Sequence, residues 1–219
     1  MSRFPRSLLL FLGLVVVGVA LLACPSSSDA EDTSPSSPDA TIPAAVADTA
    51  TFAGGCFWCT ESVFKQVDGV ESIVSGYAGG HVDDPSYEAV CREETGHAEC
   101  VQVTYDPEVV RYEELLAAFF TTHNPTTLNR QGNDVGTQYR SAVFYHDDEQ
   151  RAAVEAFVEE IRTAYDDDIV TEVEPLETFY PAEEYHQDYF EKNPNQGYCQ
   201  LTIPPKLDKL RAKHADLLA

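Results

Sequence analysis

Two cysteines beside a pair of glycines are the first residues that suggest chemistry, in the segment Gly54-Gly55-Cys56-Phe57-Trp58-Cys59. Cys56 follows the glycines directly and precedes a pattern of apolar residues with helical spacing, so we expect it at the first turn of a helix. Free backbone N–H groups and the positive end of the helix dipole stabilise a thiolate at such a position. The pattern therefore predicts an activated nucleophilic thiol, in preference to an inert buried one.

Cys56 and Cys59 also form a Cys-X-X-Cys pair, which permits two further interpretations. The two thiols could close a disulfide, as in thioredoxin-like redox sites, or they could be half of a zinc site. A zinc site needs a second pair of Cys or His ligands at suitable spacing, and the sequence offers none. Redox chemistry is favoured, and no metal is expected.

The chain has six cysteines. Five remain when Cys24, which lies close to the N-terminus, is set aside: Cys56, Cys59, Cys91, Cys100 and Cys199. An odd number argues against a closed framework of structural disulfides and for at least one thiol that is kept for chemistry. Cys100 alternates towards the core and is expected to be inert.

The N-terminal segment has the features of an export signal. Arg3 and Arg6 precede an apolar run over residues 8–22, and Leu21-Leu22-Ala23-Cys24 resembles a bacterial lipobox. This resemblance implies cleavage after residue 23 and lipidation of Cys24, whose acyl chains would anchor the protein on the periplasmic or extracellular side of a membrane. The alternative is an uncleaved transmembrane helix, although the run is slightly short for one.

Residues 24–47 are rich in Ser, Pro, Asp, Ala and Thr, which favours a disordered linker, and residues 48–219 are expected to form one catalytic domain. The formal net charge of −23 argues against binding to nucleic acid, which is itself anionic. We interpret the excess of acidic residues as a feature that keeps the protein soluble, for example in a cell with high salt whose proteins are generally acidic.

Strands and helices are mixed along the folded part, which predicts an α+β sandwich. We expect strands at 49–53, 70–77, 101–105, 141–145 and 169–174, and helices from Cys56 and over 112–122, 147–165 and 183–191. Residues 193–202 are expected to form a loop.

Six sequence blocks, in order, resemble the signature of the A-type peptide methionine sulfoxide reductases. They are Gly55-Cys56-Phe57-Trp58, Ser75-Gly76-Tyr77-Ala78-Gly79-Gly80, Pro85-Ser86-Tyr87, Thr95-Gly96-His97-Ala98-Glu99, Gln131 to Ser141 (QGNDVGTQYRS), and Asn193 to Cys199 (NPNQGYC). The resemblance extends from about residue 50 to 211. It implies a two-layer α+β sandwich with a ferredoxin-like core, in which helices cover a mixed sheet.

The resemblance also implies a role for each matching residue. Cys56 would be the nucleophile, Phe57 and Trp58 would form an apolar pocket for the substrate methyl group, and the sulfoxide oxygen would contact Glu99, Tyr87 and Tyr139. Asp134 and His186 match family positions close to the substrate. Cys59 is a departure, because many members have glycine there, whereas Cys199 matches a recycling cysteine of many members.

These residue types suit reduction of a sulfoxide. Its sulfur is electrophilic only when the oxygen is protonated or strongly hydrogen-bonded, and a buried glutamic acid with two phenols can supply this. Attack by Cys56 would release methionine and leave a sulfenic acid, which Cys59 and Cys199 would convert to a disulfide. The expected partners are free methionine S-sulfoxide, oxidised proteins and a thioredoxin-like reductant, with no cofactor.

Two other classes of function stay open. A general thiol-disulfide oxidoreductase would use Cys56 and Cys59, would have a thioredoxin-like fold and would give no reason for the blocks around Glu99, Tyr87 and Tyr139. A noncatalytic surface lipoprotein would use its cysteines structurally. Only the reductase releases methionine stoichiometrically from its sulfoxide.

Overall fold

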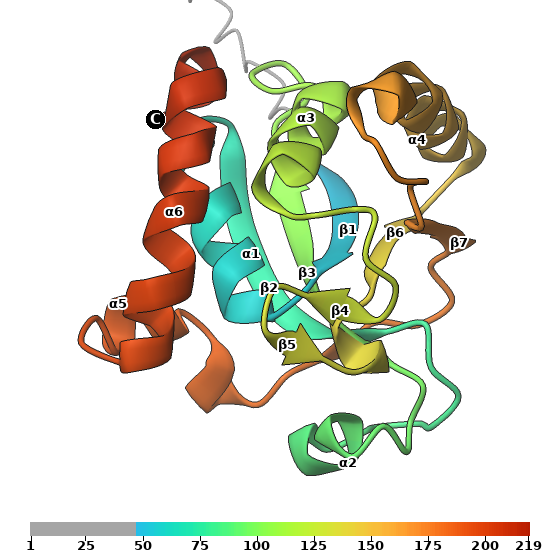
Figure 1. Ribbon diagram of the computed structural model, residues 1–219, viewed down its shortest axis with the longest axis vertical. Coiled ribbons are helices and arrows are strands. Elements are labelled where there is room, and N and C mark those ends of the chain that lie inside the picture. Colours follow the sequence, from blue (N-terminus) through green and yellow to red (C-terminus); the bar gives the residue numbers. More distant parts are fainter. Residues whose placement is uncertain (1–46) are drawn as a thin grey trace, which may run out of the picture. The chain divides into compact units, whose positions relative to one another are not determined.

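The computed structural model describes residues 47–219 (Figure 1). The predicted signal peptide (1–23), the lipidation site Cys24 and nearly all of the predicted linker lie outside the described residues. The fold begins one residue after this boundary, at the first strand, β1 (Asp48–Gly54).

A six-stranded sheet forms the centre of the domain, in the order β7-β6-β1-β3-β2-β8. The other five strands are β2 (Val70–Ala78), β3 (Ala98–Tyr105), β6 (Ser141–Tyr145), β7 (Glu172–Pro175) and β8 (Tyr180–Pro181). Neighbouring strands are antiparallel except β6 and β7, which are parallel, so the sheet is mixed as expected.

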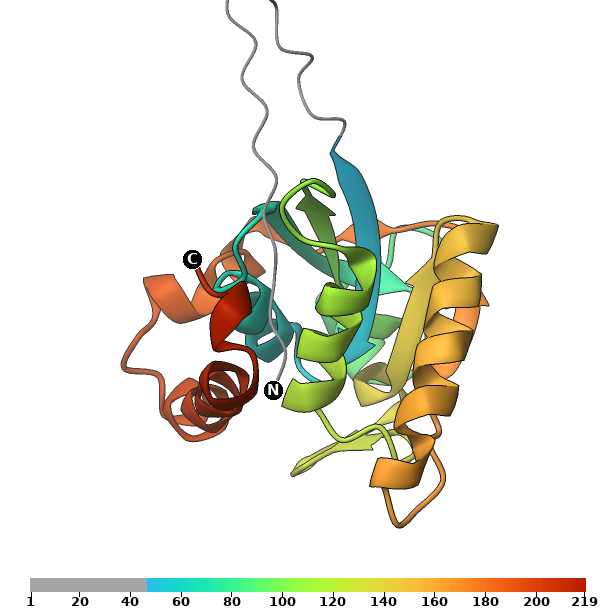
Figure 2. The ribbon, with the colours of Figure 1, turned by 90° about the horizontal axis from the view of Figure 1, so that it is seen from above.

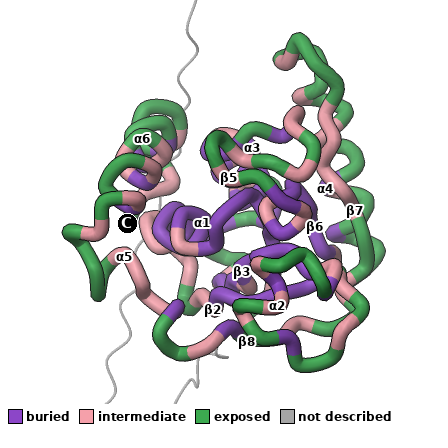
Figure 3. The backbone as a smooth tube through the Cα atoms, turned by 60° about the horizontal axis from the view of Figure 1, so that its bottom comes forward, coloured by how far each residue is buried: buried purple, intermediate pink, exposed green. Residues whose placement is uncertain are grey.

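Four helices cover one face of the sheet: α1 (Phe57–Phe64), α3 (Tyr112–Thr122), α4 (Asp148–Ile161) and α6 (Gly197–Lys213) (Figures 1 and 2). Between the layers, Phe52 of β1 stacks on Phe64 of α1 and contacts Phe119 of α3, with ring centroids 4.9 and 5.1 Å apart. Figure 3 shows α1 and the central strands as the most buried part of the backbone. The expected two-layer α+β sandwich is confirmed.

The opposite face of the sheet is lined mainly by small side chains, including Ala53, Ala98 and Ala142, and Leu176 and Phe179 from an irregular segment pack against it. Short elements complete the described chain: α2 (Tyr87–Cys91), the hairpin β4 (Arg130–Gln131) and β5 (Asp134–Val135), the 3-10 helices Thr137–Tyr139, Arg162–Ala164, Glu184–His186 and Ala215–Leu217, and α5 (Tyr189–Lys192). Among residues 47–219, no helix has both the length and the apolar character needed to cross a bilayer.

Most of the expected elements are present, but the bounds of two strands and the course of one helix differ. The expected strand at 101–105 begins three residues earlier, at Ala98, and the strand expected from 169 begins only at Glu172. The helix expected over 183–191 is interrupted at Asp188, whose φ of 55° is left-handed, so a 3-10 turn and α5 take its place.

The prediction that 193–202 forms a loop is wrong, because α6 begins at Gly197. The Gln196 side chain accepts a hydrogen bond from the backbone N–H of Cys199 (2.9 Å) and so caps the helix. Ile203 and Leu210 are fully buried on its inner face. The helix persists through Pro204 and Pro205 because this face packs against α1 and α3.

Candidate active site

The turn from β1 to α1 places Cys56 at the N-terminus of α1. Gly55 has a φ of 94°, and a Cβ atom there would lie 2.6 Å from Cγ of Gln131, so both its conformation and its surroundings require glycine. Cys56 is the N-cap residue of α1 and is 8% exposed. The expected position of this cysteine is confirmed.

Glu99 reaches the same place from β3. Its Oε2 accepts a hydrogen bond from the backbone N–H of Phe57 (3.0 Å), and its side chain also contacts the Cys56 thiol. The residue is 1% exposed, and burial raises the pKa of its carboxyl to about 8. At neutral pH Glu99 is therefore mostly a neutral acid that can donate a proton.

A cavity of about 250 Å³ opens beside these two groups. It is lined by Cys56, Phe57, Trp58, Tyr87, Glu99, Asp134, Tyr139 and Tyr198. The structure thus brings together all four residues expected to be catalytic and three of the four expected to bind substrate. Burial raises the pKa of both Tyr87 and Tyr139 above the ordinary tyrosine value, so both phenols keep their protons and can act as hydrogen-bond donors.

His186 lies behind the cavity wall and does not line the cavity. Its Nδ1 accepts a hydrogen bond from Nε1 of Trp58 (3.2 Å), and its ring lies 5.0 Å from that of Phe57 and 4.4 Å from that of Tyr87. His186 therefore holds the aromatic residues that face the cavity. Burial lowers the pKa of its imidazole, which favours the neutral form that this hydrogen bond requires.

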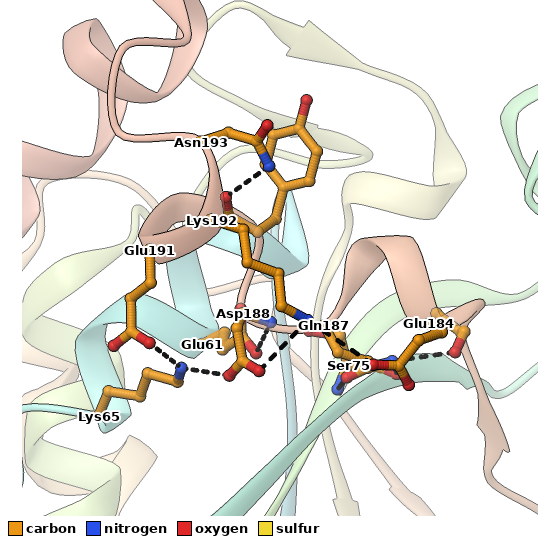
Figure 4. A network of polar contacts seen from close by, with 11 residues as sticks. Glu61, Lys65, Ser75, Glu184, Gln187, Asp188, Glu191, Lys192 and Asn193 are labelled. Carbon is orange, nitrogen blue, oxygen red and sulfur yellow. Dashed lines mark hydrogen bonds and ion pairs between the residues drawn. The ribbon is translucent and has the colours of Figure 1, made fainter.

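The segment that carries His186 is tied to α1 and β2 by a polar network (Figure 4). Lys65 forms ion pairs with Asp188 and Glu191, and the backbone N–H of Asp188 donates to Glu61 (2.9 Å). Next to this network, Tyr189 stacks on Trp58 with 3.7 Å between ring centroids. The outer side of Trp58 is fixed by these contacts.

Tyr198 belongs to the cavity although no role was assigned to it from the sequence. Its hydroxyl donates a hydrogen bond to Asp134 of β5, and its ring meets Trp58 edge-on at 6.3 Å. The sequence offered one indication of a role for Tyr198, namely its place directly before Cys199 in the last sequence block. The block suggested a recycling cysteine but gave no reason to single out its neighbour.

The charge state of the two thiols differs from the expectation for Cys56. Burial, the Cys59 thiol and the nearby Glu99 together raise the pKa of Cys56 well above its ordinary value, and the Trp58 N–H at the helix start does not offset them. The hydrogen bond from Cys56 instead lowers the pKa of Cys59 to about 7. The pair is therefore partly ionised near neutral pH, and in the substrate-free protein the negative charge is favoured on Cys59.

A second cavity, of about 350 Å³, reaches the thiol pair from the side of α6. Its lining residues include Cys56, Cys59, Asp134, Tyr198, Thr202 and Lys206. Cys199 lines neither cavity and is fully buried in the first turn of α6. The structure brings Cys59 next to the expected nucleophile, and it does not bring Cys199 there.

The remaining thiols lie apart from this pair. Cys100 is fully buried behind the sheet, which agrees with the expectation of an inert core thiol. Cys91 is half-buried at the end of α2, where its thiol contacts the Tyr87 hydroxyl. All five cysteines within 47–219 are free thiols, and no group of three or more His, Cys, Asp or Glu side chains in that range could hold a metal ion.

Comparisons with known proteins agree with this site. The sequence model of the family described as peptide methionine sulfoxide reductase matches residues 48–218. A relative from Natronomonas pharaonis, named peptide methionine sulfoxide reductase MsrA, is 61% identical over 170 residues, which cover 77% of this chain and 96% of the relative. A relative of the same name from Acinetobacter baumannii (strain AYE) is 58% identical over 171 residues, which cover 77% of this chain and 97% of the relative.

Two solved structures share the fold. Reduced Mxr1 from Saccharomyces cerevisiae matches with a TM-score of 0.64 at 39% identity, over 68% of this chain and 87% of that one. Methionine sulfoxide reductase A of Corynebacterium diphtheriae matches with a TM-score of 0.63 at 36% identity, over 68% of this chain and 76% of that one. The chain therefore belongs to the A-type peptide methionine sulfoxide reductase family, whose members are oxidoreductases that act on sulfur.

Proposed function

We propose that Cys56 attacks the sulfur of methionine S-sulfoxide while Glu99 protonates its oxygen. The supporting observation is the single cavity that holds the Cys56 thiol, a neutral Glu99 and two protonated phenols next to an apolar wall. The sulfur–oxygen bond of the substrate breaks as oxygen moves to Cys56. The products are methionine and a sulfenic acid on Cys56.

The thiol pair supplies the nucleophile in spite of the raised pKa of Cys56. Because Cys56 donates a hydrogen bond to Cys59, moving this shared proton to Cys59 places the negative charge on Cys56. Tyr87 and Tyr139 then donate to the sulfoxide oxygen as negative charge develops on it. Phe57 and Trp58 enclose the methyl group, and this contact selects the S epimer.

The test uses the purified full chain with racemic methionine sulfoxide and dithiothreitol, and measures which diastereomer disappears. We expect selective loss of the S epimer, no loss with Cys56→Ser, and unchanged loss with the Cys100→Ser control. Loss of neither epimer, with strong disulfide reductase activity, would favour a general thiol-disulfide oxidoreductase.

We further propose that Cys59 closes the first disulfide with Cys56 and that Cys199 takes part later. Cys59 lies beside Cys56, whereas Cys199 is buried and must leave the first turn of α6 before it can react. Mass spectrometry after one equivalent of substrate tests this order. A Cys56–Cys59 bond should form first, and a Cys56–Cys199 bond in its place would remove Cys59 from the scheme.

A thioredoxin-like dithiol is the proposed source of electrons after turnover of free or protein-bound substrate. By thiol-disulfide exchange it would reduce the disulfide of the enzyme and itself become a disulfide. The proposed location of the protein is a membrane surface, to which lipid on Cys24 would anchor it. This proposal is supported by Arg3, Arg6 and the lipobox-like residues 21–24. Metabolic labelling with a radioactive fatty acid should mark the wild type and leave Cys24→Ser unlabelled. Equal labelling of both would contradict the anchor.

A further inference from the structure

One face of α6 presents three polar side chains to Cys59. Tyr198, Thr202 and Lys206 follow each other at intervals of four residues, so they lie on the same side of the helix. All three line the second cavity together with Cys59. α6 lies beside α1 in Figures 1 and 2, and the two helices are in contact. The side of Cys59 that faces away from the sheet is therefore formed by α6.

The contacts on this face suit a negatively charged sulfur. Sγ of Cys59 lies 3.6 Å from Oγ1 of Thr202, and the Tyr198 hydroxyl is also within hydrogen-bonding reach of the sulfur. The Thr202 hydroxyl, which now donates to the Tyr198 carbonyl (2.8 Å), can turn towards the sulfur. Two hydroxyl groups thus surround Cys59.

Lys206 supplies the positive charge. Its Nζ donates a hydrogen bond to the Thr122 carbonyl (2.7 Å), which fixes the amine at the end of the cavity. No carboxylate of the described chain forms an ion pair with Lys206. Burial lowers the pKa of this amine, and the attraction of Cys59 opposes that shift. Lys206 is half-buried, and an ammonium that is partly removed from water and has no carboxylate partner is stabilised by another anion nearby.

We propose that Lys206 is a positioning residue that holds Cys59 as the thiolate which attacks the Cys56 sulfenic acid. In this step the Cys59 sulfur forms a bond to the Cys56 sulfur, the sulfur–oxygen bond of the sulfenic acid breaks, and hydroxide leaves and takes up a proton to become water. Cys59 is oxidised and the sulfenic acid is reduced. The inference rests on the proposed function, because it assumes that Cys59 is the first resolving thiol.

Lys206 is the source of positive charge among the groups around Cys59. Cys56 at the start of α1, Glu99 on β3, Asp134 on β5, and Tyr198 and Cys199 on α6 surround Cys59, and none of them can carry a positive charge, whereas Lys206 is the cation that lowers the pKa of Cys59. The hydrogen bond from Cys56 has the largest effect on this pKa, but it is lost once Cys56 is oxidised. At that stage Lys206, Thr202 and Tyr198 are the groups left to stabilise the thiolate, and Lys206 is the charged one.

The test compares Lys206→Met, which keeps the length of the chain without the charge, with Lys206→Arg, which keeps a charge. Lys213→Met is the matched control, because Lys213 is exposed in the last turn of the same helix. Each full-length variant is mixed with one equivalent of methionine sulfoxide and no reductant. Methionine release, the lifetime of the sulfenic acid (by dimedone trapping) and the Cys56–Cys59 disulfide (by mass spectrometry) are followed over time.

We expect Lys206→Met to release a full equivalent of methionine and, once the sulfenic acid has formed, to close the disulfide about fivefold more slowly, because the smaller thiolate fraction outweighs the higher nucleophilicity of a more basic thiol. Lys206→Arg should restore most of the rate, and Lys213→Met should match the wild type. In a Cys56→Ser background, whose hydroxyl can still donate to Cys59, Lys206→Met should also move the alkylation of Cys59 by iodoacetamide to higher pH.

Unchanged disulfide formation in Lys206→Met, with full methionine release, would overturn the role of Lys206. A different result would contradict the proposal that Cys59 is the first resolving thiol. In that case the sulfenic acid of Cys59→Ser would disappear as quickly as that of the wild type. Full methionine release also shows that a variant is folded. If Lys206→Met does not release methionine, the pH dependence of Cys59 alkylation is compared between Lys206→Arg and the wild type instead. A difference of more than one pH unit between these two proteins would contradict a role of Lys206 that depends on charge alone.

Discussion

The two sides of Cys56 are built from different parts of the chain and have different chemical character. On one side, α1, α2 and β3 supply an aromatic wall and a neutral acid, which suit an uncharged sulfoxide. On the other side, α6 supplies hydroxyl groups and a half-buried lysine around Cys59, which suit a thiolate. The reaction needs both, because the first half consumes a proton at oxygen and the second half consumes a thiolate.

This comparison explains why burial acts in opposite ways on neighbouring groups. Glu99 keeps its proton because burial, together with the nearby Asp134 and Cys59, raises its pKa, and a proton is what the sulfoxide oxygen requires. Cys59 is almost as buried, yet its pKa is lowered because the Cys56 thiol and Lys206 face it. The direction of each shift follows from the groups that face the side chain, and the depth of burial alone does not determine it.

The largest expected effect comes from Glu99→Gln on the substrate side. We expect methionine release to fall about 1,000-fold, because the amide keeps the shape and the hydrogen bond to Phe57 but cannot donate a proton to the leaving oxygen. In the wild type, the rate should fall as pH rises above about 8, where Glu99 ionises. Rapid-quench measurement of methionine between pH 6 and pH 9.5 checks both points. An alkaline limb that persists in Glu99→Gln would show that another group controls it.

The same residue should make stability depend on pH. The pKa of Glu99 is raised to about 8 in the folded state, so the folded protein keeps a proton that the unfolded chain releases above its ordinary value. Stability from this group is complete at low pH and is lost as pH rises towards 8, by an amount of up to roughly 4 kcal/mol. Urea unfolding at pH 5 and pH 8.5 should show this loss in the wild type and in the exposed-residue control Glu149→Gln. Glu99→Gln should be nearly insensitive, and equal losses in all three proteins would assign the effect elsewhere.

Tyr87→Phe and Tyr139→Phe should each slow methionine release by about 10- to 100-fold, because each removes one donor to the sulfoxide oxygen. Neither should change the rate at which the Cys56–Cys59 disulfide forms, since both phenols line only the substrate cavity. Tyr145→Phe, at the end of β6 and away from both cavities, is the control. A slower disulfide step in either variant would mean that the two sides are not separate.

The substrate side could be predicted from the sequence better than the thiolate side, for a physical reason. Strands and helices such as 112–122 and 141–145 follow from local periodicity, and Cys56, Glu99 and Tyr139 lie in sequence blocks that resemble those of a known family. The contacts around Cys59 join residues more than 140 positions apart, as Cys59 and Thr202 show. No local sequence pattern indicates such contacts, so the role of Lys206 beside Cys59 could not be predicted.

Two errors have the same origin. Residues 193–202 were expected to form a loop, but burial of Ile203 and Leu210 stabilises α6 from Gly197 onwards, even with the prolines at 204 and 205 inside the helix. The N-terminus of α1 suggested a low pKa for Cys56, but Glu99 and the burial of the site, both set by tertiary structure, reverse it. Local sequence rules therefore held for most of the elements and failed where distant segments meet.

Tyr198→Phe should give the smallest effect and the sharpest test of the comparison, because Tyr198 lines both cavities. Phenylalanine keeps the ring against Trp58 and removes only the hydroxyl that lies between Asp134 and Cys59. We expect the rates of methionine release and of disulfide formation each to fall by about threefold to fivefold. This corresponds to the loss of one hydrogen bond, which contributes roughly 1 kcal/mol. A single-turnover experiment resolves the two rates in one sample. If only one rate changes, Tyr198 belongs functionally to that side alone, although its side chain borders both.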